Sequence, residues 1–243
     1  MEIELKNIGL IDHCKVKIDG ITIISGENAT GKSTVGKALY GVFNGLNDIF
    51  NQVDEIRHEN IYGIFLRYSR SAEMKRSIDY RKKYDELICY IIKNRNQFIS
   101  NKKSLNYYIM KNKNVIIDEE NQIHDTLLER SSYYSSKNID DEIESITEEI
   151  FESLKISTEL IIKRIVQRSL DSEFRGDIKN KYKTAEETSV INLTIKDEIV
   201  KVEILKDEVS KVKNVMSMTK EIVYIDDPYV IDDLNKVMRS GFF

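Results

Sequence analysis

The stretch Gly26-Glu27-Asn28-Ala29-Thr30-Gly31-Lys32-Ser33-Thr34 decides how this sequence is interpreted. Residues 26–33 match the pattern G-x-x-x-x-G-K-[ST], which is typical of phosphate-binding loops. Glycine has no Cβ, so the backbone of such a loop can wrap closely around phosphate oxygens while its N–H groups point inward. We expect Lys32 to reach the β- and γ-phosphates, the Ser33 hydroxyl to bind Mg²⁺, and Thr34 to lie near the α-phosphate.

The segments on either side of this stretch have the order that a phosphate loop requires. Residues 2–8 and 14–18 alternate apolar and polar side chains, which predicts two half-buried strands. Residues 21–24 (Ile-Thr-Ile-Ile) form a β-branched run that predicts a fully buried strand. The residues after the loop predict a helix, because apolar side chains recur there at helical spacing: Val35, Ala38, Leu39, Val42, Phe43 and Leu46. This context favours nucleotide binding by residues 26–34, and ATP with Mg²⁺ is the expected ligand.

The pattern of apolar residues changes twice along the chain, which predicts three regions. Residues 1–47 contain the N-terminal strands, the loop and the first helix. Residues 48–187 predict a mostly helical insertion, with polar breaks near 94–106 and 131–138 and a short strand at 115–117. Residues 188–243 predict returning strands at 190–195, 200–204, 209–215 and 222–225, and then the start of a helix.

Composition limits the compartment and the class of protein. The formal net charge is −4, so the chain as a whole is not a basic nucleic-acid coat protein. Two cysteines are too few for a disulfide framework, and no secretory segment begins the sequence. The longest apolar runs are too short to cross a bilayer. We therefore expect a cytoplasmic protein without a membrane partner.

Residues 2–46, with a strand pair (IELKNIGLIDHCKVKI), a further strand, the loop and a helix, resemble the start of ABC-type ATPase heads. The likeness is greatest to the bacterial RecF, SMC and overcoming-lysogenization (OLD) nuclease classes, and it is looser over the insertion and the strands at 189–225. The resemblance implies an α/β fold: a P-loop core with an antiparallel flank and a large helical insertion. It also implies ATP-dependent pairing of heads, as a homodimer or with a partner ATPase subunit, and often work on DNA or in anti-phage defence.

A complete head of this family carries elements that this sequence lacks. One is a signature segment rich in Ser and Gly, yet no glycine lies between Gly176 and Gly241. Another is a late histidine, yet the three histidines are His13, His58 and His124. We therefore do not expect this chain to hydrolyse ATP by itself, because phosphoryl transfer depends on such positioning and charge-neutralising groups.

Residues 222–228 (Ile-Val-Tyr-Ile-Asp-Asp-Pro) have two interpretations. In the first, Asp226 holds Mg²⁺ through water and Asp227 replaces the catalytic glutamate with a side chain that is one methylene shorter. In the second, which the order of motifs in the resembling family favours, the strand simply ends in a turn at Asp-Pro. The chain would then be only the N-terminal portion of a longer ATPase: a truncated gene product, one half of a split pair or a degenerate copy.

Two other functions compete with an ATPase head. One is a regulatory or interaction module that binds nucleotide without turnover, with the helical insertion contacting a partner protein. The other is a P-loop kinase for a small molecule, which the long insertion after the first helix argues against.

Basic residues cluster at 75–76, 81–83 and 93–95, with Tyr80, Tyr84 and Tyr90 between them. Such a pattern suits a nucleic-acid contact. It also suits a solvated helix face with tyrosines in the core, which we prefer because blocks of charge are usually just solvated. Nucleic acid therefore stays open as a partner.

Overall fold

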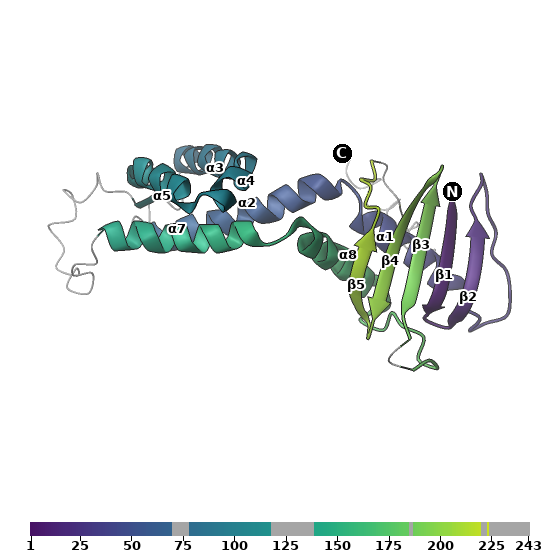
Figure 1. The fold of residues 1–243 in the computed structure, drawn as a ribbon. Coiled ribbons are helices and arrows are strands. Elements are labelled where there is room, and N and C mark those ends of the chain that lie inside the picture. Colours follow the sequence, from purple (N-terminus) through teal and green to yellow (C-terminus); the bar gives the residue numbers. More distant parts are fainter. Residues whose placement is uncertain (70–77, 118–138, 185–186, 220–222, 224–243) are drawn as a thin grey trace, which may run out of the picture. The chain divides into compact units, whose positions relative to one another are not determined.

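The computed structural model describes residues 1–69, 78–117, 139–184, 187–219 and Val223. Over these residues the chain is a mixed α/β protein that divides into two compact units (Figure 1). The first unit joins Met1–Ile49 to the described residues from Ile162 onward. The second unit consists of the described residues between Phe50 and Ile161.

The first unit is built on a five-stranded antiparallel sheet with the order β2-β1-β3-β4-β5 (Figure 1). The strands are β1 (Glu2–Ile8), β2 (Ile11–Lys17), β3 (Ser189–Ile195), β4 (Glu198–Leu205) and β5 (Glu208–Lys213). Leu5 of β1 lies opposite Cys14 of β2 and Ile191 of β3, so the two ends of the sequence meet in the centre of the sheet. Alternate side chains of β1, β3 and β4 are fully buried, as the period of two requires.

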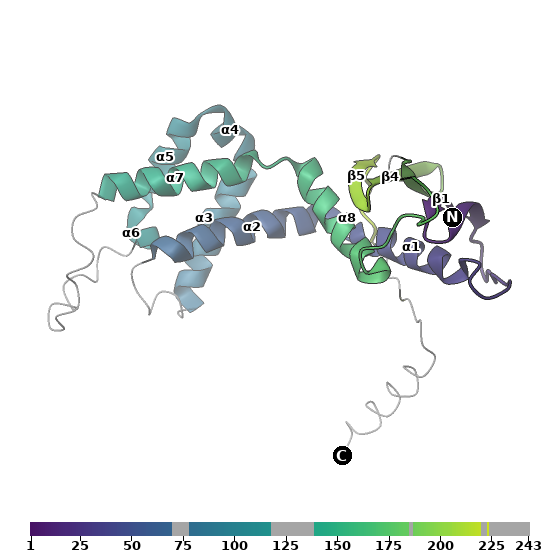
Figure 2. The same cartoon turned by 90° about the horizontal axis from the view of Figure 1, so that it is seen from below.

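Helices α1 (Lys32–Gly45) and α8 (Thr158–Phe174) cover the apolar face of this sheet (Figure 2). The helices approach each other closely because α1 has glycine at two contact positions. A Cβ on Gly41 would lie 2.9 Å from Leu170 Cδ2, and one on Gly45 would lie 3.2 Å from the Cα of Val166. Gln167 of α8 ties the helix to the sheet: its amide donates to Asp207 O at 3.0 Å and accepts from the N–H of Val209 at 2.5 Å.

The opposite face of the sheet carries a ladder of charged side chains. Lys15 pairs with Glu2 at 2.8 Å, and the carboxylate of Glu203 pairs with Lys201 at 2.9 Å and with Lys213 at 2.6 Å. Hydrogen bonds from these two ammonium groups lower the pKa of Glu203 from 4.5 to about 2. This face is therefore polar, and ion pairs between neighbouring strands and along β4 neutralise part of its charge.

The second unit is helical. Its helices are α2 (Ile49–Tyr68), α3 (Ile78–Lys93), α4 (Arg95–Ser100), α5 (Lys102–Lys111), α6 (Lys113–Ile117) and α7 (Ile139–Lys155). Their apolar stripes meet in one core, which includes Phe65, Tyr84, Ile88, Leu105 and Ile150. Helix α7 buries Ile143, Ile146, Ile150 and Leu154 and turns its acidic side chains away from this core.

Two arginines satisfy the carbonyl groups at the end of α7, which have no partner within the helix. The guanidinium of Arg95 donates to Leu154 O at 2.7 Å and to Ile156 O at 3.3 Å. Arg57 donates to Ile156 O at 3.2 Å and to the Thr158 hydroxyl at 3.0 Å. Burial, together with the charge of Arg95, lowers the pKa of Arg57.

The predicted α/β class, the helical insertion and the strands within residues 2–17 and 189–213 are confirmed. The sheet is antiparallel throughout, as expected of the flank, whereas a P-loop core usually contains a parallel sheet. The short strand at 115–117 was wrong, since these residues belong to helix α6. The polar break predicted near 94–106 was wrong over most of its length, because helices α4 and α5 occupy these residues apart from Asn94 and Asn101. The break at 131–138, the helix after residue 230 and, apart from Val223, the strand at 222–225 lie outside the described residues.

The buried strand predicted at 21–24 was also wrong. The segment is irregular, and the side chains of Ile21 and Ile23 are 92% and 85% exposed. A β-strand needs a neighbour for its N–H and C=O groups, and no residue in the described part of the chain forms a ladder with this segment. The β-branched composition of residues 21–24 favours a buried strand, but no described strand pairs with this segment.

The ion pairs of Glu203 predict a pH-dependent contribution to stability. The folded pKa lies below the ordinary value, so the contribution is fully present above about pH 4.5 and is lost as the pH falls to about 2. Glu203→Gln should therefore lower the melting temperature at pH 7 but make little difference near pH 2. Thermal unfolding at both pH values checks this, with Glu198→Gln as the control because Glu198 is exposed. An equal effect of Glu203→Gln at both pH values would contradict it.

Candidate nucleotide-binding site

The loop at 26–31 has the backbone shape of an anion-binding turn. Ala29 and Gly31 have positive φ angles of 61° and 90°, which turn successive peptide groups toward the same side of the chain. The hydroxyl of Thr30 donates to Glu27 O at 2.9 Å and closes the loop from within. Residues 26–30 are exposed to solvent, so Gly26, Glu27, Asn28, Ala29 and Thr30 stand where a ligand can reach them.

Lys32 folds back over this loop. Its ammonium group donates to Gly26 O at 2.8 Å and also to the carbonyl oxygen of Glu27. The ammonium group is thereby held at the mouth of the loop, within reach of an incoming phosphate.

Lys32 is the first residue of α1, and the first turn of this helix contains no acidic side chain. Its N-cap residue, Gly31, makes no side-chain hydrogen bond to cap that turn. The N–H groups there have no acceptor within the helix, and the helix dipole adds positive potential at the same point. Ser33 is exposed in this first turn, and its hydroxyl is available to a cation that accompanies the anion.

The turn between β1 and β2 holds the loop from the other side. A Cβ on Gly31 would lie 2.7 Å from Ile11 Cγ1, and one on Gly9 would lie 3.0 Å from Thr34 Cγ2. Glycine at both positions therefore allows the turn to pack directly on the start of α1. Thr34, predicted to lie near the α-phosphate, here contacts this turn and also donates its N–H to Gly31 O at 3.1 Å.

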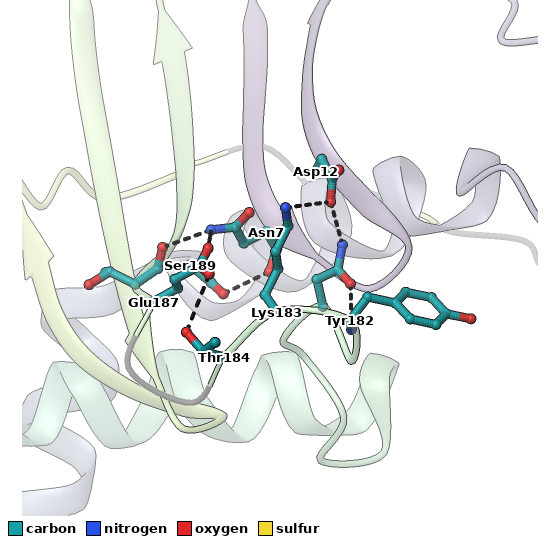
Figure 3. A network of polar contacts seen from close by, with 9 residues as sticks. Asn7, Asp12, Tyr182, Lys183, Thr184, Glu187 and Ser189 are labelled. Atoms are coloured by element: carbon teal, nitrogen blue, oxygen red, sulfur yellow. Dashed lines mark hydrogen bonds and ion pairs between the residues drawn. The ribbon is translucent and has the colours of Figure 1, made fainter.

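A network of polar side chains fixes the β1–β2 turn to the loop before β3 (Figure 3). Asn180 is 1% exposed; its side-chain amide donates to the carboxylate of Asp12 at 3.0 Å and its N–H to Asn7 O at 2.9 Å. Lys183 pairs with the same carboxylate at 3.5 Å. The hydroxyl of Ser189 donates to Asn7 O at 2.7 Å. Because Asp12 is part of one wall of the pocket described next, this network helps to fix the position of that wall.

A pocket of about 390 Å³ opens between β2 and the phosphate loop. Residues 10–14 and Val16 form one wall, while Ile24, Ser25, Val35 and residues 30–32 form the other. Its volume lies within the range of about 300–1,000 Å³ that is usual for small-molecule sites. Its lining combines apolar side chains such as Ile11 and Val35 with the cationic Lys32.

The contribution of β2 to this pocket could not be predicted from the sequence. His13 and Cys14 were interpreted as strand residues, and they do lie in β2, but both also line the pocket. Burial raises the pKa of Cys14, so its thiol is a neutral wall group rather than a nucleophile. No local pattern could have indicated this role, because it arises from the packing of the turn on α1.

The predicted acidic residues cannot be placed against the loop. Asp226 and Asp227 lie outside the described residues. Within the described ranges, no three His, Cys, Asp or Glu side chains gather as a metal site would require. The structure thus brings together residues 26–34, while the assignment of Asp226 to Mg²⁺ and of Asp227 to catalysis stays a prediction.

Because Gly31 packs against Ile11, we expect a single added methyl group at position 31 to lower the stability of this unit. Gly31→Ala adds a Cβ into Ile11 at a φ of 90° and should destabilise the unit by about 2–4 kcal/mol, from backbone strain and overpacking together. Gly176→Ala is the matched control, because Gly176 also has a positive φ, of 82°, but open space around it. Urea unfolding of both variants measures the difference. Equal destabilisation would show that the β1–β2 turn does not press on the loop.

Comparison with known proteins adds no relatives. No protein-family model, no curated protein and no solved structure matches the chain. No helix in the described ranges combines the length and apolar character that crossing a membrane requires.

Proposed function

We propose that this chain binds ATP with Mg²⁺ through residues 26–34, as part of a RecF/SMC/OLD-like ATPase head. The observation that carries the proposal is Lys32, whose ammonium group is folded onto the carbonyls of Gly26 and Glu27 at the uncapped, acid-free start of α1. A lysine, a helix N-terminus and a glycine-rich turn that converge at one exposed point are suited to a polyphosphate.

Each part of the site has a separate role in this proposal. The N–H groups of residues 28–33 and the helix N-terminus bind phosphate oxygens, and Lys32 neutralises the terminal phosphates. The Ser33 hydroxyl binds Mg²⁺, which neutralises charge on the polyphosphate when it is bound. The pocket beside β2 receives the nucleoside, with aliphatic side chains such as Ile11 and Val35 contacting the base.

The antiparallel sheet agrees with the flank that the resembling ATPase heads carry beside the nucleotide site. The segment at 21–24 has no strand partner among the described residues. A parallel P-loop core that includes this segment is therefore a proposal. We infer that hydrolysis needs groups from outside the described residues, contributed by a second head or a partner ATPase subunit. The proposed setting is the cytoplasm, in DNA maintenance or anti-phage defence.

Lys32→Ala tests the phosphate-binding role directly. Removing one charge-assisted contact to the phosphates should weaken Mg-ATP binding by about 10- to 100-fold while leaving the melting temperature close to that of the original chain. Isothermal titration calorimetry measures the affinity. Lys37→Ala is the matched control, since Lys37 lies on the same helix but has no contact with the loop. Unchanged affinity in Lys32→Ala would remove residues 26–34 from the binding site.

Turnover separates an ATPase head from the two competing functions. The purified chain with saturating Mg-ATP should release no phosphate above the level of the Lys32→Ala variant. Turnover that requires Lys32 would mean that Asp226 and Asp227, or another group, already complete the site. Phosphate transfer to an added small molecule would instead support the kinase.

A further inference from the structure

Charge is distributed very unevenly within the helical unit. Residues 93–117, which run from the end of α3 through α4, α5 and α6, contain six Lys or Arg residues and no Asp or Glu. Helix α7 is the opposite, with seven acidic residues and one lysine. A chain of net charge −4 therefore contains one segment of positive charge without any acidic residue. Such an excess on one part of the surface attracts polyanions.

Helix α5 displays this charge around an exposed aromatic ring. Leu105 and Ile109 are fully buried and define the inner face of the helix. Tyr107 lies two residues from each of them, which at about 100° per residue places it on the opposite face, and its side chain is 71% exposed. Lys103 and Lys111 lie one turn before and one turn after Tyr107, and both are exposed.

Among the residues that the structure describes, Lys103 and Lys111 have no acidic partner. Lys102 points the other way and pairs with Glu148 of α7, and Arg67 of α2 pairs with Glu149. In contrast, no ion pair joins Lys103 or Lys111 to any acidic residue that the structure describes. The many carboxylates of α7 are thus available to neighbouring cations, yet these two lysines present their charge to solvent.

A second exposed aromatic ring lies beside α5. Tyr90 of α3 is 48% exposed and stacks on Tyr108 of α5, with ring centroids 4.6 Å apart and planes 16° from parallel. Tyr108 directly follows Tyr107, and Lys93 is exposed one turn after Tyr90. Tyr84 lies in the core, as expected if the charged residues simply form a solvated helix face, but Tyr90 is exposed.

We propose that the surface formed by Lys103, Tyr107 and Lys111 of α5, with Tyr90 and Lys93 of α3, binds a single-stranded nucleic acid. The lysines contact phosphates, and the exposed rings of Tyr107 and Tyr90 stack on unpaired bases. Stacking requires bases with open faces, so a single strand fits better than a duplex. This surface belongs to the helical unit, and the proposal does not depend on ATP binding at the phosphate loop.

Fluorescence anisotropy of a labelled dT20 oligonucleotide on the full chain tests the proposal. The double variant Lys103→Gln/Lys111→Gln should weaken binding and reduce the slope of log K against log salt by about 1.4, because each phosphate contact on a single strand contributes about 0.7. Lys17→Gln/Lys211→Gln removes the same charge from exposed positions on the sheet, and it should leave both quantities unchanged. If the two double variants weaken binding equally, the surface is not the site and only net charge matters.

Tyr107→Ala tests the stacking part of the proposal. It should weaken dT20 binding by about 5- to 100-fold with an unchanged salt slope, because it removes a stacking contact and no charge. Tyr182→Ala is the control, since the Tyr182 side chain is 84% exposed but lies in the other unit. The proposal is overturned if dT20 does not bind, if a duplex of the same length binds as tightly, or if Tyr107→Ala has no effect. Binding of U20 as well as dT20 would support it for both kinds of strand.

Discussion

The packing of the β1–β2 turn on the start of α1 is the contact on which the candidate site depends. It depends on glycine at positions 9 and 31, because a Cβ at 31 would collide with Ile11 and one at 9 would lie only 3.0 Å from Thr34 Cγ2. The turn is itself held by Asn180 and Ser189, which bind the backbone of Asn7. The phosphate loop is therefore supported by residues from both ends of the sequence. This one contact holds Lys32, the N-terminus of α1 and the pocket beside β2 close to one another.

The two units use charge in different ways. On the sheet, acidic and basic side chains lie close together and neutralise one another, as Glu203 does with Lys201 of the same strand and Lys213 of the next. In the helical unit the two signs are separated, with acidic residues on α7 and basic residues over 93–117, from the end of α3 through α6. Lys102 with Glu148 is a pair that connects them. Charge that pairs within the fold contributes to stability, whereas charge that stays exposed in excess of its partners is available to a ligand.

The parts of the fold that could be predicted from the sequence are those set by local patterns. Strands β3 to β5 follow from a period of two interrupted by turns such as Lys206-Asp207, both of which have positive φ. The phosphate-binding role of residues 26–34 rests on residue types at fixed spacing and stays a prediction. The stripe on α7 was equally clear, because Ile143, Ile146 and Ile150 recur at helical spacing and are buried.

Features that depend on distant partners could not be predicted in this way. Asn180 and Asp12, which position the pocket wall, are 168 residues apart. Residues 21–24 have the composition of a buried strand, but composition does not tell whether a pairing strand is present. Residues 115–117 are β-branched and yet helical, because α6 packs against α3 and Tyr84 donates a hydrogen bond to Ile116 O at 3.3 Å. Tertiary packing overrides weak local propensity in such short segments.

The most direct measurement is a crystal structure of the chain with Mg²⁺ and a non-hydrolysable ATP analogue. When the nucleotide is bound, the Lys32 ammonium group should leave the carbonyls of Gly26 and Glu27 and contact the terminal phosphates, with the base in the pocket beside β2. A nucleotide bound elsewhere, or a Lys32 that keeps its contacts with the loop while the phosphates lie outside it, would contradict the central claim.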